Sequence, residues 1–160
     1  MQIAPDWAPN IHPMILHFPI ALLIIAIFVD VWSVILKKQV WIRYSAIMLY
    51  TFGTLAALFA YLSGHEAAES VYLPPLANSV LYHHSNLALM TVLYFVIFAL
   101  IRLSSIWKAG KRYVLISIIL LIFTLPGLYL IIETGEHGAE LVYKYGVGIQ
   151  KTENLNRENK

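Results

Sequence analysis

The stretch Ile15–Leu36, ILHFPIALLIIAIFVDVWSVIL, decides the fold class of this chain. Its only acidic or basic side chain apart from His17 is Asp30, and the rest is almost wholly apolar. At 1.5 Å per residue, a helix of about 20 residues matches the roughly 30 Å hydrocarbon core of a bilayer. We therefore expect this stretch to cross a membrane as an α-helix.

Three further apolar runs of similar length follow the first. The chain is 59% hydrophobic and only 12% charged, whereas soluble domains carry roughly 25% charged residues. We predict an all-α, integral membrane four-helix bundle over residues 1–149, followed by a polar tail at 150–160 that we expect to be disordered. The predicted spans are residues 15–36, 41–62, 86–106 and 113–132.

Basic residues indicate how the spans are oriented. Residues 1–17 and 63–85 contain no Lys or Arg. The first and third connectors hold Lys37, Lys38, Arg43, Arg102, Lys108, Lys111 and Arg112. Because Lys and Arg gather on the cytoplasmic side, we expect a multi-pass protein of the bacterial cytoplasmic membrane with both termini outside. Its first partner is the lipid bilayer, and a net charge of +2 is too small to indicate nucleic acid.

The sequence contains an internal repeat. Ser63–Tyr72, SGHEAAESVY, aligns without gaps with Thr134–Tyr143, TGEHGAELVY, and each segment follows an even-numbered span. His17–Leu22 resembles His84–Leu89 more weakly, at the start of the odd-numbered spans. Two related helical hairpins, a parallel repeat about the membrane normal, are predicted. The repeat pairs His17 with His84, and His65 with His137.

All six histidines fall on the predicted outer side, where His65 and His137 are expected just past their helix ends. The chain has no cysteine, which excludes thiolate sites and covalent c-type haem. The candidate cofactor ligands are His17, His65, His84, His137 and His12. The candidate metal ligands are His17, His65, His84, His137, Glu66 and Glu136. Imidazole suits haem iron as well as divalent transition metals, so haem b, a metal ion and no cofactor all stay open.

Two features of the first span have alternative interpretations. Asp30 lies inside the span, where an acid is costly, and an ion pair with Arg43, Arg102 or a connector lysine is favoured over a proton relay. The helix begins either near Pro13, with a bend at Pro19, or at Pro19 itself.

The opening IHPMILHFPIAL, residues 11–22, and the closing TGEHGAELVYKYGVG, residues 134–148, resemble a bacterial family of predicted four-helix membrane proteins of unknown function. The resemblance covers residues 11–149. Ala139 replaces the second of two paired glycines in the family's closing pattern. Similar domains occur fused to Rieske-type or c-type cytochrome domains, which implies an association with membrane electron transfer.

We therefore expect an electron-transfer subunit resembling a b-type cytochrome, with its cofactor near the outer face. The resemblance implies a periplasmic cytochrome or Rieske-type protein as partner. A divalent-metal binding or transport protein using the same residues is the first alternative, and a cofactor-free structural subunit the second. No nucleophile–base group or phosphate loop indicates a standalone enzyme, and the sequence does not indicate an oligomeric state.

Overall fold

The computed structural model describes residues 10–107 and 110–149, and these contain helices but no strand. The elements are α1 (His12–Ile15), α2 (His17–Ile35), α3 (Val40–Ser70), the 3-10 turn η1 (Pro75–Ala77), α4 (Asn78–Ser104), the 3-10 turn η2 (Ser105–Trp107) and α5 (Gly110–Tyr143). The all-α prediction is confirmed. The predicted tail at 150–160 lies outside the described residues.

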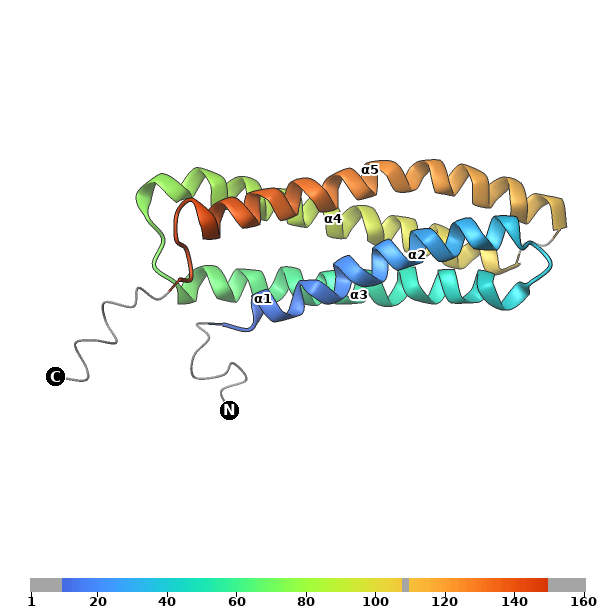
Figure 1. The fold of residues 1–160 in the computed structure, drawn as a ribbon, viewed down its shortest axis with the longest axis horizontal. Coiled ribbons are helices and arrows are strands. Elements are labelled where there is room, and N and C mark those ends of the chain that lie inside the picture. Colours follow the sequence, from blue (N-terminus) through green and yellow to red (C-terminus); the bar gives the residue numbers. More distant parts are fainter. Residues whose placement is uncertain (1–9, 108–109, 150–160) are drawn as a thin grey trace.

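The long helices α2, α3, α4 and α5 run up and down along one axis (Figure 1). Each packs against the next along the chain, and α2 also packs against α5, which closes the bundle. Four helical stretches are long and apolar enough to cross a membrane, as predicted: His12–Ile35, Val40–Ser70, Pro75–Ser104 and Arg112–Tyr143.

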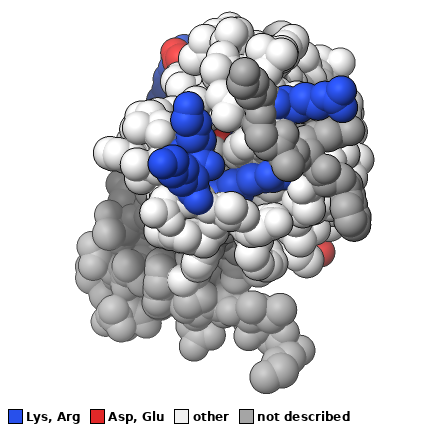
Figure 2. All heavy atoms as spheres, turned by 90° about the vertical axis from the view of Figure 1, so that its right-hand side faces the viewer, with Lys and Arg blue, Asp and Glu red and all other residues white. Residues whose placement is uncertain are grey.

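The bundle has two chemically different ends. The histidine end comprises the starts of α1, α2 and α4 and the ends of α3 and α5, which carry all six histidines. The opposite basic end holds the turn Leu36–Gln39 and the α4–α5 connection. Figure 2, seen from the basic end, shows Lys and Arg side chains spread over it. Lys37, Lys38 and Arg112 are exposed. Which end faces the cytoplasm stays a prediction.

Three helices continue beyond the apolar runs at the histidine end. α3 extends to Ser70 and α5 to Tyr143, while α4 already begins at Asn78. The expectation that His65 and His137 follow their helix ends is therefore wrong, because both lie inside helices. The segments after the apolar runs are rich in Ala and Glu, which favour helix, and contain no proline. Hydropathy marks where a span leaves the membrane and not where its helix ends.

The entry to the first span contains a short break. α1 begins at His12 with Pro13 in its first turn, and α2 begins at His17. Pro19 has no N–H to bond the carbonyl of Ile15, and Ile15 is where α1 ends. The early helix start near Pro13 is confirmed, whereas the break lies at Leu16, before His17, and not at the predicted bend at Pro19.

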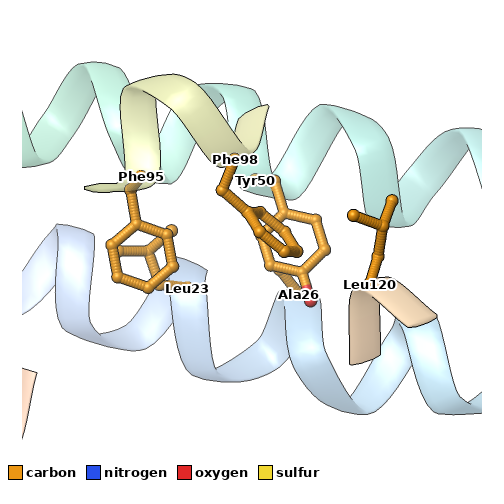
Figure 3. Close-up of a cluster of buried hydrophobic side chains, with 6 residues drawn as sticks. All are labelled: Leu23, Ala26, Tyr50, Phe95, Phe98 and Leu120. Atoms are coloured by element: carbon orange, nitrogen blue, oxygen red, sulfur yellow. The ribbon is translucent and has the colours of Figure 1, made fainter. Parts of the chain in front are cut away.

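The apolar core lies at mid-bundle and is largely aromatic (Figure 3). Leu23 and Ala26 of α2 meet Tyr50 of α3, and Tyr50 packs edge to face on Phe98 of α4, with ring centroids 4.9 Å apart. The remaining members of the buried cluster are Phe95 and Leu120. This cluster separates the histidine end from the polar groups on the basic side.

Two glycines allow the helices to approach closely. A Cβ atom on Gly53 would lie 2.8 Å from Leu23 Cδ2, and one on Gly127 would lie 2.8 Å from both Phe95 Cζ and Tyr94 Cε1. Gly53 and Ala57 are small residues four positions apart on α3, and the close contact of Gly53 with α2 is what such pairs permit. Helix α5 continues through Pro126, and the Tyr94 hydroxyl of α4 donates to the carbonyl of Phe123 in the preceding turn.

A buried ion pair links the helices on the basic side of the core. Arg102 of α4 donates to Asp30 Oδ1 of α2, and both side chains are 0% exposed. Arg102 also donates to Ser117 Oγ at 3.0 Å, and Ser33 Oγ lies 3.0 Å from Asp30 Oδ1. The guanidinium of Arg43 lies 3.9 Å from the centre of the Tyr113 ring. The predicted ion pair of Asp30 is confirmed, with Arg102 as its partner.

Candidate functional site

His12 of α1 is fixed against α3 by packing and by a hydrogen bond. A Cβ atom on Gly64 would lie 3.0 Å from His12 Cε1, so the ring occupies space that only glycine leaves. His12 Nδ1 lies 3.1 Å from Ser63 Oγ, and that hydroxyl donates to the carbonyl of Ala60 at 2.9 Å. Because the serine proton is used by Ala60, Nδ1–H must be the donor to Ser63. The Nε2 atom of neutral His12 then keeps its lone pair.

His84 of α4 is fixed against α5 in a similar way. Its Nδ1 lies 3.0 Å from the carbonyl oxygen of Thr134. A carbonyl only accepts, so Nδ1 carries the proton and Nε2 of the neutral ring carries the lone pair. A Cβ atom on Gly138 would lie 3.1 Å from His84 Cε1. The ring therefore also packs on a glycine of the neighbouring helix.

The two histidines are counterparts in the two hairpins. Ser63 and Thr134 occupy the same position of the internal repeat, and each is the hydrogen-bond partner of one histidine Nδ1. The structure thus gives His12, and not His17, as the counterpart of His84.

A third imidazole, that of His137 on α5, lies toward the surface of the same end. His137 Nδ1 lies 2.9 Å from the carbonyl oxygen of Glu133, so its Nε2 also keeps a lone pair. Its ring centroid lies 6.2 Å from that of His83, a residue that sequence analysis left without a role. His12, His84 and His137, which we call the histidine cluster, are half-buried, while His83 is exposed.

The other candidate residues do not join this cluster. His17, His65, Glu66 and Glu136 are all exposed. Within residues 10–107 and 110–149, no three His, Asp or Glu side chains are grouped closely enough to hold a metal ion. His17 and His65 as cofactor ligands, and the six-residue metal set, stay predictions that this geometry does not test.

Comparison with known protein families assigns the chain to a family. Residues 8–151 match the family described as "Predicted membrane protein (DUF2231)". The chain belongs to this family. No curated protein and no solved structure matches it. Membership of the DUF2231 family confirms the resemblance to membrane proteins of unknown function, while fusion to cytochrome domains stays a prediction.

Helical phase explains which histidines of this DUF2231 protein turn inward. His12 and His17 lie on either side of the break between α1 and α2, and His17 is exposed. Ser63 and His65 differ by about 200°, so the buried Ser63 turns His65 outward. Thr134 and His137 differ by only about 60°, which keeps His137 in the histidine cluster.

The signals that sequence analysis missed are present in the repeat. Ser63 and Thr134 align there, and a glycine that packs on a histidine follows each of them, Gly64 directly on α3 and Gly138 four residues later on α5, although these two glycines are not counterparts in the repeat. Continuing the helices through both repeat segments would have placed these hydroxyl and glycine positions on the inward faces. The contact between His83 and His137 joins different helices and has no comparable signal in the repeat.

Proposed function

We propose that this chain binds one haem b at the histidine end, with His12 and His84 as axial ligands, and serves as a membrane-embedded electron-transfer subunit resembling a b-type cytochrome. The observation that carries the proposal is the hydrogen bonding of the two rings. Both donate Nδ1–H to α3 or α5, which leaves both Nε2 lone pairs for iron. Ligand histidines are usually oriented by such a bond from the second ring nitrogen.

The donor set suits haem better than a small metal ion. Haem needs two axial ligands, and two histidines on different helices of a bundle are a common source. A zinc or non-haem iron site needs three or more protein ligands, and the described part of the chain contains no such group. Divalent-metal binding at His17, His65, His84, His137, Glu66 and Glu136 is thus the less supported alternative.

The residues around the two histidines have separate tasks. Ser63, itself bonded to Ala60, and the Thr134 carbonyl fix the ring orientation and the proton position. Gly64 and Gly138 let the rings lie directly against α3 and α5. Haem supplies one-electron oxidation and reduction when bound. The aromatic core around Phe95 and Phe98 excludes water from the side facing the basic end.

The position of the histidines near one end of the bundle suits electron exchange with a soluble protein. His12 and His84 are half-buried, within a few residues of the helix starts. If the histidine end faces outward, as the basic residues predict, a periplasmic cytochrome or Rieske-type protein is the partner that the family resemblance implies.

The experiment is a visible absorption spectrum of the protein purified in detergent after expression with added haem precursor. We expect a Soret band and, after reduction by dithionite, the sharp α band of a b-type cytochrome. Absence of both bands contradicts the proposal. Elemental analysis of the same sample then distinguishes a bound divalent metal from a cofactor-free subunit.

A further inference from the structure

The basic end carries exposed cations that no carboxylate among the described residues neutralises. Lys37 and Lys38 lie in the turn between α2 and α3, Arg112 lies in the first turn of α5, and all three are exposed. The one acid of this end within the described ranges is Asp30, which is fully buried and bonded to Arg102. Lys and Arg side chains spread over this face in Figure 2. The end therefore presents a positive surface that calls for an external counter-charge.

A contact between α2 and α5 brings two of these cations to one edge of the bundle. Ser33 Oγ of α2 lies 3.1 Å from the hydroxyl oxygen of Tyr113 on α5. Lys37 follows Ser33 by only four residues, and Arg112 directly precedes Tyr113. Both cationic side chains are long and exposed, so one anionic group at the edge between α2 and α5 can contact them together.

Arg43 of α3 fixes the helices beneath this edge. Its guanidinium donates to the carbonyl oxygens of Ser105 and Ile106, just past the end of α4. The same guanidinium lies 3.9 Å from the centre of the Tyr113 ring. Because Arg43 is buried and uses its donors on these carbonyls, it holds the start of α5 in place, and the exposed cations remain available to a ligand.

Two exposed tryptophans place these cations at the level of the lipid headgroups. Trp32 of α2 is 55% exposed and Trp41 of α3 is 65% exposed. They precede and follow the turn that holds Lys37 and Lys38. Tryptophan gathers at the interface between membrane and water, where the phosphates of the lipids lie. A lipid can therefore contact the indole rings and the cations together, which a soluble anion would not do.

We propose that Lys37, Lys38 and Arg112 bind the phosphate of an anionic phospholipid from the leaflet at the basic end. Arginine offers paired donors to phosphate oxygens, and lysine adds a compact positive charge. Lys and Arg beside a membrane span attract anionic headgroups in this way. The site contains no histidine, so it does not depend on the proposed haem.

The test is native mass spectrometry of the detergent-purified full chain, titrated with phosphatidylglycerol and phosphatidylcholine of the same acyl chains. We expect the chain to retain phosphatidylglycerol in preference to phosphatidylcholine. Lys37→Gln and Arg112→Gln should each weaken phosphatidylglycerol binding roughly fivefold, since each removes one cation at the membrane surface. Lys144→Gln removes an exposed cation from the histidine end, and this matched control should bind the lipid as the wild type does.

Equal retention of the two lipids by the wild type overturns the proposal, as does wild-type binding in both Lys37→Gln and Arg112→Gln. Inorganic phosphate at the concentration of the lipid should leave the lipid bound, and displacement by it would show a site for free anions instead. Both residues are exposed, so the variants are expected to fold, which circular dichroism checks. Preference for phosphatidylglycerol without haem bands contradicts the proposed function alone.

Discussion

Replacing His12 or His84 by alanine is expected to abolish the low-spin haem spectrum of the purified protein. Each change removes one of the two Nε2 lone pairs that the hydrogen bonds to Ser63 and Thr134 leave available. We expect retained haem to fall below about a tenth of the wild-type content, a loss of at least about 1.4 kcal/mol in binding free energy. The measurement is haem content per chain by absorption after purification.

Two matched controls separate ligation from a general effect of removing histidine. His17 and His65 lie at the same end but are exposed and outside the cluster. We expect His17→Ala and His65→Ala to keep the wild-type haem content and spectrum. Loss of haem in either control, together with wild-type content in His12→Ala, would show that the ligands are assigned to the wrong histidines.

Arg102→Met is expected to destabilise the bundle by about 3–5 kcal/mol, because it leaves the Asp30 carboxylate buried without its partner. Asp30 and Arg102 are both 0% exposed. Asp30 Oδ2 and Arg102 Nε already lack a hydrogen-bond partner among the described residues, so little remains to replace the ion pair. The measurement is the free energy of unfolding in mixed micelles, followed by circular dichroism.

The double variant Asp30→Asn with Arg102→Met completes a double-mutant cycle and tests whether the loss comes from the unpaired charge. Removing both charges should recover most of the loss, because an unpaired buried charge costs more than the pair contributes. Lys144→Met breaks the exposed pair with Glu140, and we expect no measurable change. Equal stability of Arg102→Met and the wild type would contradict the assignment of a buried ion pair.

The membrane fold was predictable from sequence because its signals are local. Apolar runs such as Ile15–Leu36 set the number of spans. Proline at position 19 predicted a bend there, whereas the structure has its break earlier, between Ile15 and His17. The sequence did not single out the ion-pair partner of Asp30. Several basic residues lie near the same end, and only packing across the bundle selects Arg102.

The candidate site was predictable only in part. The sequence brought the histidines to one end but favoured His17 over His12 as the counterpart of His84. That choice depended on the short resemblance of residues 17–22 to residues 84–89, whereas the structure gives His12 and His84 equivalent hydrogen-bond partners. The helices α3 and α5 also continue past the points where hydropathy falls. Once the helices are continued, the phase relative to the buried Ser63 turns His65 outward. The ring orientations of His12 and His84 depend on contacts between helices, which no local pattern contains.

The most direct test of a single haem shared by the two hairpins is an electron paramagnetic resonance spectrum of the oxidised, haem-loaded protein, with haem and protein quantified in the same sample. We predict one low-spin ferric haem per chain, because His12 and His84 supply both axial positions. A high-spin signal, two haems per chain, or no bound haem despite adequate supply would contradict the account.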